Sequence, residues 1–443
     1  MSDSGDSFNH PHQFDTLCVH AGQTPDRATH SRGVPVHRTS SYVFDSTAHA
    51  ADLFSLRQPG NIYTRIMNPT QEVLEKRLAA LEGGAACLAL ASGTAAVHYS
   101  IINICSAGDE VVSANNLYGG TYTMFDAILP QFGITVRFAD PREPKSFDAA
   151  VTDKTRAIFV ETVGNPTLEF TDLDAISEIA RNHHLPLIVD GTFTTPALLR
   201  TIGHGADIVV NSATKWIGGH GTAIGGAVID AGTFDWTDPK FKLFNEPDPS
   251  YHDIRYAHDL GDLNPVAFIM RMRLVPLRNL GACMSPDNAW MFLQGLETLH
   301  LRMERHSENA LKVAEYLNDH DKVSWVRYPG LPKDPSHPVA ARYLKKGFGG
   351  MVVFGIKGGA ETGAAFIENL RLFSHLANVG DAKSLALHPS STSHSQLSEA
   401  QQKAGGLTPD LIRLSIGIEH VEDIVRDLPR QRQGIRLRLS AGA

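Results

Sequence analysis

The sequence predicts an α/β protein with a mostly parallel sheet covered by helices on both faces, followed by a smaller α+β domain. From about Glu72 onward, short apolar runs typical of buried strands alternate with longer segments of helical periodicity. Two of these runs, at 187–192 and 206–210, lead into polar residues of the kind that α/β folds place around ligands. The chain is also longer than one ordinary domain, at 443 residues.

The first 70 residues are polar and rich in turns, and their five prolines interrupt any long helix. We therefore expect an extended N-terminal arm at 1–70. The alternation that follows predicts helices at 72–81, 94–104, 121–132 and 172–182, and strands at 86–91, 110–114, 134–138, 157–161, 187–192 and 206–210. This order is typical of parallel strands joined by helices.

The segment 230–284 breaks the alternation and is rich in proline, aspartate and aromatic residues, so we expect a structured insertion there. Ser285, Pro286 and Asp287 combine an N-cap, a helix-first proline and an acidic first turn. They predict a long helix to about Asn318 that bridges to a smaller α+β domain with strands at 323–326, 351–355 and 411–415. The predicted units are an arm (1–70), an α/β domain (71–284) and a C-terminal α+β domain (285–443).

Composition excludes several classes of partner. A formal net charge of −8 and a pI near 6.2 argue against nucleic-acid or acidic-membrane partners. Met1–His12 has no apolar core, so no signal peptide is expected, and no run approaches the ~20 apolar residues of a membrane span. The 21 histidines are dispersed, so we expect no metal site. The cysteines are scattered and favour a reducing cytoplasm without disulfides: Cys18, Cys87, Cys105 and Cys283.

The segment Ser212–Gly221 carries the strongest chemical signal. Lys215 follows the apolar run 206–210 and lies between hydroxyl residues and a glycine-rich turn. Desolvation or a neighbouring cation makes such a lysine nucleophilic, which suits a Schiff base with a carbonyl compound. Ser212 and Thr214 can donate to phosphate oxygens, and the glycines let the backbone approach a ligand closely. A surface lysine in a polar turn is the alternative, which the flanking pattern disfavours.

Asp190 lies at the end of the strand predicted at 187–192. A carboxylate in this place can pair with the protonated ring nitrogen of a pyridine cofactor. Taken alone, Asp190 is explained equally well as a helix cap for Thr192 and the residues after it. Beside Lys215, it favours a pyridoxal-phosphate site.

Ser92, Gly93 and Thr94 follow the strand at 86–91 and precede a predicted helix. Free backbone N–H groups and the positive end of the helix dipole meet there, which makes a natural phosphate site. A plain helix cap explains these three residues equally well.

These motifs resemble the Cys/Met-metabolism family of pyridoxal-phosphate enzymes, which have fold-type I, the aspartate aminotransferase-like fold. The resemblance runs from about 17 to about 428 and includes the segments Tyr63–Thr70 and Ile412–Gly417. It implies that pyridoxal 5′-phosphate is the cofactor, that Lys215 is its catalytic lysine and that Asp190 pairs with its ring nitrogen.

The resemblance also assigns the remaining site residues. Tyr118 would stack on the cofactor ring and assist catalysis beside Lys215. Asn165, Ser384 and Arg413 would bind the substrate. A loop tyrosine at 118 and a structural salt bridge at Arg413 are the alternatives. The residues that match family contacts to the cofactor are Tyr63, Arg65, Ser92, Gly93, Thr94, Tyr118, Asn165, Asp190, Ser212, Thr214 and Lys215.

Tyr63 and Arg65 match family residues that reach the cofactor phosphate of the partner subunit. The resemblance therefore implies a homo-oligomer, a homotetramer of two catalytic dimers. Without the resemblance, a solvated arginine would be the favoured interpretation of Arg65. The chain departs from the family's usual pattern at Gly191, at Asn211 and at Val36–Arg38, and none of these changes removes a catalytic group.

The segments Asp381–Pro389 and Glu246–Tyr251 resemble the sulfhydrylases of this family. The resemblance implies that sulfide or methanethiol replaces the acetate of O-acetyl-L-homoserine, giving homocysteine or methionine. Cystathionine γ-synthase, methionine γ-lyase and O-succinylhomoserine sulfhydrylase activities remain open, because those enzymes share the site. A non-catalytic protein that binds a phosphate ligand is disfavoured, because binding alone needs no Schiff-base lysine.

Overall fold

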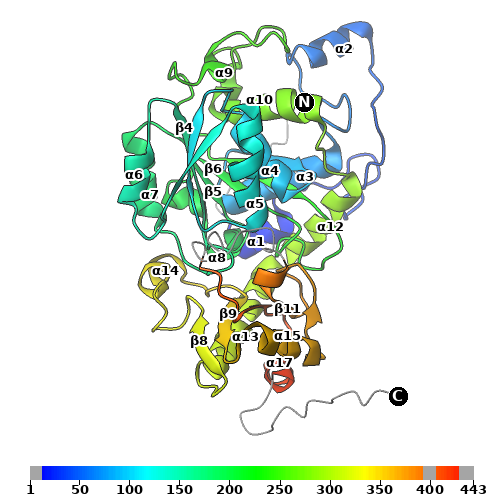
Figure 1. The fold of residues 1–443 in the computed structure, drawn as a ribbon. Helices are drawn as coiled ribbons and strands as arrows, with labels where there is room; N and C mark the ends of the chain where they lie inside the picture. Colours follow the sequence, from blue (N-terminus) through cyan, green and yellow to red (C-terminus); the bar gives the residue numbers. More distant parts are fainter. Residues whose placement is uncertain (1–11, 393–405, 429–443) are drawn as a thin grey trace, which may run out of the picture.

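The computed structural model describes residues 12–392 and 406–428. Outside these ranges lie residues 1–11, 393–405 and 429–443. They include most of the segment Met1–His12 and parts of the predicted arm and of the predicted C-terminal domain. The described chain forms a seven-stranded sheet and a five-stranded sheet at opposite ends of the molecule (Figure 1). The predicted α/β class with a smaller α+β unit is confirmed.

The large sheet is mostly parallel, as predicted. Its order is β1-β7-β6-β5-β4-β2-β3, and only β7 runs against the other strands. The sequence analysis missed β7 because it follows β6 through a glycine-rich turn, without a helix between them. The strands are β1 (Ala86–Leu90), β2 (Glu110–Ala114), β3 (Thr135–Ala139), β4 (Thr155–Glu161), β5 (Leu187–Asp190), β6 (Ile208–Asn211) and β7 (Gly226–Asp230).

Helices cover both faces of this sheet, with α6 and α7 on one side and α3, α4 and α5 on the other (Figure 1). The helix predicted at 121–132 changes type along its length: a π-helical turn, Met124–Ile128, and a 3₁₀ turn, Leu129–Phe132, follow α5. Pro130 has no N–H to donate to an α-helical bond. The helices are α3 (Pro69–Glu82), α4 (Gly93–Ile102), α5 (Gly119–Thr123), α6 (Lys145–Ala150), α7 (Leu173–Asn182) and α8 (Thr195–Leu198).

The arm contains two short helices, α1 (Phe14–His20) and α2 (Thr47–Phe54). α1 packs against α3 with Phe14 and Cys18 buried, which ties the start of the described arm to the large domain. The segment 230–284 is also ordered around aromatic side chains, since Trp236 stacks on Phe244 with ring centroids 4.4 Å apart. Its helices are α9 (Lys242–Asn245), a 3₁₀ turn (Gly261–Val266), α10 (Ala267–Met272), a π-helical turn (Arg273–Leu277) and α11 (Arg278–Leu280).

The helix predicted from Ser285 to Asn318 is two helices, α12 (Pro286–Glu297) and α13 (Leu299–Asn318). The break at Thr298 lets α12 pack on α3 while α13 packs on the small sheet. Early α13 residues such as Met303 belong to the hydrophobic core of the large sheet, and Ala310 belongs to that of the small sheet. We therefore propose that the domain boundary lies within α13.

The small sheet has the order β10-β11-β12-β9-β8 and is antiparallel except between β10 and β11. The three predicted strands correspond to β8, β9 and β12. The two that were not predicted, β10 and β11, are too short to give a periodic signal. The elements are β8 (Val323–Arg327), α14 (His337–Tyr343), β9 (Met351–Ile356), α15 (Gly359–Asn369), β10 (Ser374–His375), β11 (Leu385–Leu387), β12 (Leu411–Ser415) and α17 (Val421–Asp427).

Several negative findings hold for residues 12–392 and 406–428. No helix there combines the length and apolar character that crossing a membrane requires. No group of three or more His, Cys, Asp and Glu side chains is arranged to hold a metal ion within the same ranges. The four cysteines are all free thiols.

Asp230 ends β7 at the amino edge of the parallel strands. Its side chain is buried, Oδ1 accepts the N–H of Gly232 at 2.8 Å and Oδ2 has no hydrogen-bond partner. Burial raises its pKa to about 7. The folded state therefore binds a proton more tightly than the unfolded state, and Asp230 lowers stability as the pH rises from the unfolded pKa toward 7.

Replacing Asp230 by Asn should remove this pH dependence. The wild-type Tm should fall more steeply than the Tm of Asp230→Asn between about pH 4 and about pH 7. Thermal unfolding in a series of buffers measures both slopes, and the exposed Asp153→Asn is the matched control. Parallel curves for wild type and Asp230→Asn would contradict the assignment.

Candidate active site

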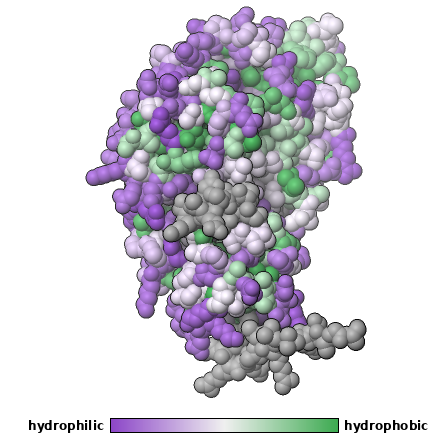
Figure 2. Space-filling view, in the orientation of Figure 1, coloured by the Kyte–Doolittle hydropathy of each residue, from purple (hydrophilic) through white to green (hydrophobic). Residues whose placement is uncertain are grey.

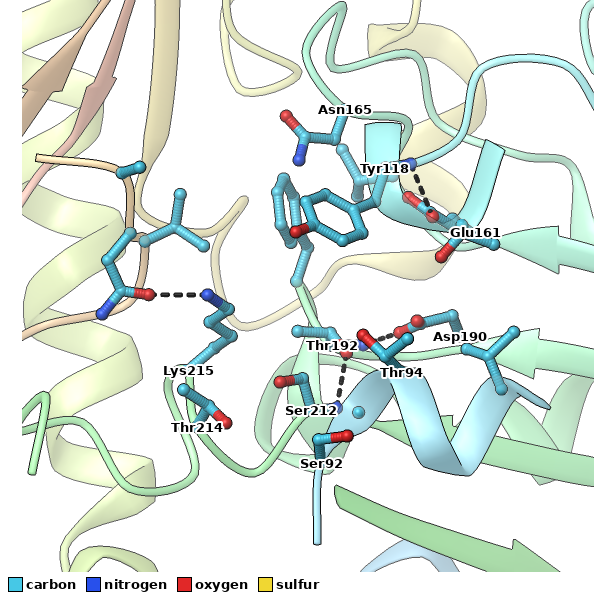
Figure 3. Close-up of a pocket in the computed structure, with 18 of the residues that line it drawn as sticks. Ser92, Thr94, Tyr118, Glu161, Asn165, Asp190, Thr192, Ser212, Thr214 and Lys215 are labelled. Carbon is cyan, nitrogen blue, oxygen red and sulfur yellow. Dashed lines mark hydrogen bonds between the residues drawn. The ribbon is translucent and has the colours of Figure 1, made fainter. Parts of the chain in front are cut away.

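A cavity of about 220 Å³ lies at the carboxyl ends of β4, β5 and β6. The start of α4 forms one wall, and β12 with the loop 377–379 closes the cavity from the side of the small sheet. The residues predicted from the sequence that line it are Ser92, Gly93, Thr94, Tyr118, Asn165, Asp190, Ser212, Thr214, Lys215 and Arg413. Figure 3 shows Lys215 and Tyr118 entering this cavity from opposite sides.

The start of α4 forms an anion-binding wall. Ser92 caps the helix, because its Oγ accepts the N–H of Ala95 at 3.0 Å. Gly93 must be glycine, since a Cβ there would lie 2.6 Å from Cβ of Ser212. The close contact brings the N-terminus of α4 and the turn after β6 together. Ser92 is therefore a helix cap and also lines a site with free N–H groups.

The turns after β5 and β6 are joined by side-chain bonds. The N–H of Ser212 donates to Oγ1 of Thr192 at 2.8 Å, and the N–H of Thr192 donates to Oδ1 of Asp190 at 2.8 Å. Thr214 Oγ1 bonds both backbone groups of Gly225, at 3.0 and 3.2 Å. These bonds fix the orientation of the loops that carry the hydroxyl groups.

Two buried carboxyl groups lie side by side in the cavity wall. Glu161 ends β4 and Asp190 ends β5, and the two residues pair in the sheet register. Burial raises the pKa of both carboxyls, and the charge of Asp190 raises that of Glu161 further. No cation among the described residues offsets this. Because like charges in a dry site do not both ionise readily, we expect the pair to share one proton near neutral pH.

Lys215 has an amine suited to proton transfer. Burial, reinforced by the charge of Arg413, lowers the pKa of its Nζ from 10.5 to about 8. The Nζ donates to Oδ1 of Asn378 at 2.6 Å (Figure 3). A substantial fraction of the amine is therefore neutral and nucleophilic near physiological pH.

Tyr118 presents its ring to the cavity and is 48% exposed. Its backbone N–H donates to Oε1 of Glu161 at 2.8 Å, which fixes the residue at the start of α5. Its ring packs on Gly120, where a Cβ would lie 2.6 Å from the ring. An aromatic face held in this way can cover a planar ring.

Arg413 is buried on β12, and its hydrogen-bond partners among residues 12–392 and 406–428 are neutral. Nη1 donates to Oδ1 of Asn165 at 3.2 Å, and Nη2 donates to the carbonyl of Asn378 at 3.4 Å. Burial lowers the pKa of the guanidinium to about 10, so it stays charged at neutral pH. Within the described part of the chain, Arg413 does not form the structural salt bridge considered from the sequence. A cation without an anion in a dry cavity is suited to bind a carboxylate.

Three predicted residues lie outside this cavity. Arg65 lies over the ring of Tyr63 at 5.3 Å, and its Nη1 donates to the carbonyl of Arg278 at 2.8 Å. Ser384 is fully buried, with its Oγ donating to Glu419 Oε2 at 3.0 Å and accepting the N–H of Gly417 at 2.9 Å. The structure does not bring Ser384 to the site, because both hydrogen-bonding functions of its hydroxyl are used in the small domain.

The lining residues that were not assigned from the sequence include Glu161, Thr192 and Asn378. Glu161 and Thr192 carried a usable signal, because each lies at or just after the carboxyl end of a predicted strand. Asn378 carried none, because it lies in irregular backbone distant in sequence from Lys215.

The donor set fits pyridoxal phosphate. The wall at α4 offers N–H and hydroxyl groups to a phosphate, the carboxyl pair offers one negative charge to a protonated ring nitrogen, and Tyr118 offers an aromatic face. Lys215 supplies the amine that a carbonyl cofactor requires. These groups converge on one cavity.

Comparisons with known proteins agree with this chemistry. Residues 15–431 match the model of the Cys/Met metabolism PLP-dependent enzymes. An O-acetyl-L-homoserine sulfhydrylase of Leptospira meyeri is 51% identical over 98% of this chain and 99% of its own length. A homocysteine synthase of Schizosaccharomyces pombe is 48% identical over 94% and 96%.

The structure is also similar to a solved one. A candidate O-acetylhomoserine (thiol)-lyase of Campylobacter jejuni superposes with a TM-score of 0.91 at 41% identity, covering 94% of this chain and 98% of that one. That crystal structure contains a pyridoxyl-lysine-phosphate residue.

The shared proton predicts different effects for Glu161 and Asp190. Glu161→Gln imitates the protonated acid and keeps an acceptor for Tyr118, so affinity for pyridoxal phosphate should change less than about threefold. Asp190→Asn removes the remaining charge and should lower affinity and turnover by about 100-fold. Fluorescence titration of the cofactor-free protein and turnover assays measure both effects. Equal losses in the two variants would contradict the one-proton pair.

Proposed function

Because this chain belongs to the Cys/Met-metabolism family of PLP-dependent enzymes, we propose that it catalyses a γ-replacement on O-acetyl-L-homoserine. A sulfur nucleophile displaces acetate, so that sulfide gives L-homocysteine and methanethiol gives L-methionine. The names of relatives support this substrate class, namely O-acetyl-L-homoserine sulfhydrylase and homocysteine synthase. The enzyme is PLP-dependent.

One observation supports the residue roles: Lys215 and Arg413 line one cavity, and the guanidinium has no carboxylate partner among the residues that the structure describes. An amino-acid substrate presents an α-carboxylate, which the free guanidinium binds, together with Asn165. This contact orients the α-carbon, whose proton Lys215 removes. The arrangement supports catalysis on an amino acid over simple binding of a phosphate ligand.

Bound pyridoxal phosphate supplies the electron sink that stabilises negative charge at the substrate's α-carbon. Lys215 acts as a free amine and takes the α-proton, for which a pKa of about 8 is well matched. Lys215 would then pass this proton to the bound cofactor and take a second proton from the β-carbon, so that acetate leaves the γ-carbon and the sulfur nucleophile adds there. Lys215 then returns protons to the substrate, so the enzyme ends in its starting state.

The other groups bind and orient. Asp190 holds the ring nitrogen protonated while Glu161 keeps the shared proton, and Tyr118 covers the ring and excludes water. We assign the cofactor phosphate to the wall formed by Ser92, Gly93, Thr94, Ser212 and Thr214.

A product assay tests this function. The purified enzyme should convert O-acetyl-L-homoserine with sulfide to homocysteine and acetate, and with methanethiol to methionine. O-succinyl-L-homoserine should react with a kcat/KM lower by at least about tenfold, and cysteine should be a poor acceptor. Efficient cystathionine formation, methionine cleavage or equal use of both esters would instead favour one of the related activities.

We also propose that the enzyme is a homo-oligomer in which Tyr63 and Arg65 complete the partner's site. Two features of these residues support this. The Tyr63 side chain is 41% exposed, and Arg65 Nε is buried without a hydrogen-bond partner. A closed two-fold dimer gives both copies the same contact. The resemblance to the family supports a tetramer of two such dimers.

Exposed apolar side chains on the arm support the same assembly. Val43, Phe54 and Tyr63 are 97%, 45% and 41% exposed. Figure 2 shows hydrophobic residues at the upper right of the molecule, where Figure 1 places α2. Apolar surface of this kind is suited to a protein partner. The four free thiols support a reducing compartment, and we propose the cytoplasm.

Mixing two inactive variants tests the shared site. Arg65→Ala should weaken cofactor retention, and Lys215→Ala should abolish turnover. When the two are mixed under subunit exchange, one site of each mixed dimer has both groups intact, so about a quarter of wild-type activity should return. Native mass spectrometry verifies exchange. Proven exchange without recovered activity would place Arg65 outside the partner's site.

A further inference from the structure

Asn378 is the direct partner of the Lys215 amine. The Lys215 Nζ donates to Asn378 Oδ1 at 2.6 Å, the bond drawn at the left of Figure 3. Asn378 lies outside the large sheet, in the irregular segment between β10 and β11, so the bond joins the two halves of the cavity. The contact is short and direct, between the reacting amine and a side chain that does not titrate.

Asn378 is held in place by bonds from several directions. The guanidinium of Arg413 donates to its backbone carbonyl at 3.4 Å. Two residues further on, the N–H of Gly380 donates to Oγ of Ser415 at 3.0 Å. Gly380 also packs so closely on the turn after Lys215 that a Cβ would lie 2.7 Å from the N of Trp216. The backbone that carries Asn378 is therefore fixed relative to the lysine turn.

Its acceptor oxygen sets the direction of the amine lone pair. A neutral amine has two N–H bonds and one lone pair. When one N–H points to Asn378 Oδ1, the lone pair does not, because a carbonyl oxygen accepts and cannot donate. The lone pair is then free to face the cavity, which Tyr118 enters from the other side. The oxygen also accepts from the ammonium form, and more strongly because that donor is charged, so the contact persists in both protonation states.

We propose, on the basis of the function proposed above, that Asn378 is the positioning residue for Lys215, holding the released amine with its lone pair toward the substrate. The proton moves from the substrate carbon to Nζ, while the electron pair of the C–H bond stays on the substrate. The ammonium keeps one N–H on Asn378 and returns a proton through another. The other ionisable groups that line the cavity are Tyr118, Glu161, Asp190 and Arg413.

Two nearly isosteric variants test the proposal: Asn378→Leu, which removes the acceptor, and Asn378→Asp, which adds a charge. The first readout uses the full-length protein with pyridoxal phosphate removed. The pH dependence of acetic-anhydride labelling of Lys215, measured by mass spectrometry, gives its pKa, with exposed Lys242 as the rate reference. Asn378→Asp should raise this pKa by about one unit or more, and Asn378→Leu should lower it.

The second readout is turnover of the reloaded enzymes. Asn378→Leu should lower kcat by at least about tenfold while KM for O-acetyl-L-homoserine changes less than about threefold. In Asn378→Asp the acidic limb of the kcat–pH profile should move to higher pH. The exposed Asn369→Asp has the same charge change as Asn378→Asp and should match wild type in both readouts. Thermal unfolding verifies that each variant is folded.

The possible outcomes distinguish failure of the positioning role of Asn378 from failure of the proposed function. If Asn378→Leu leaves the Lys215 pKa within about 0.3 unit of wild type and kcat within about twofold, the positioning role is overturned. If Asn378→Leu does not fold, an unshifted Lys215 pKa in Asn378→Asp overturns it. If wild type makes no homocysteine from O-acetyl-L-homoserine, the proposed function fails, whereas the labelling result still reports on the Lys215–Asn378 contact.

Discussion

The bond between the turn that follows Lys215 and the segment 376–384 is the constraint on which the site depends. The N–H of Ala382 donates to the carbonyl of Gly219 at 2.8 Å. From α13, the buried guanidinium of Arg302 donates to the carbonyls of Trp216 at 2.7 Å and Gly295 at 2.7 Å. The lysine turn is thus tied to both the small sheet and the bridging helices. Without these bonds the two halves of the cavity would not face each other.

Burial without counter-ions gives this cavity its chemistry. In the described ranges, Asp190 and Glu161 have no cation beside them and Arg413 has no anion, so each group keeps the capacity to bind an opposite charge from a ligand. The same desolvation brings the Lys215 pKa to about 8. A protein would lose stability by burying such groups for structure alone, so their convergence is a signature of a ligand site.

Two departures from the family pattern lie together in the structure. A Cβ built on Gly191 would lie 3.7 Å from Oδ1 of Asn211, in ordinary contact. The two positions, distant in sequence, are neighbours because β5 and β6 pair in the sheet. The departure at Val36–Arg38 lies apart from them, since Arg38 pairs with Asp287 at the start of α12. The changes at Gly191 and Asn211 therefore alter residues beside the strand ends that carry the site, and the reacting groups stay in place.

The sequence by itself determined the fold class and most of the site. Apolar runs fixed where the parallel strands end, and because those ends meet at one edge, residues such as Asp190 and Lys215 were expected together. The helix break at Thr298, the strand β7 and the place of Ser384 were decided by tertiary contacts. α12 packs on α3 and α13 on the small sheet, β7 pairs with β1 and β6, and Ser384 bonds to Glu419 and Gly417. The pairing of Glu161 with Asp190 and of Asn378 with Lys215 depends on register and on contacts between distant segments. Local sequence encodes strand ends, whereas only the folded chain decides which side chains from different segments share one dry cavity.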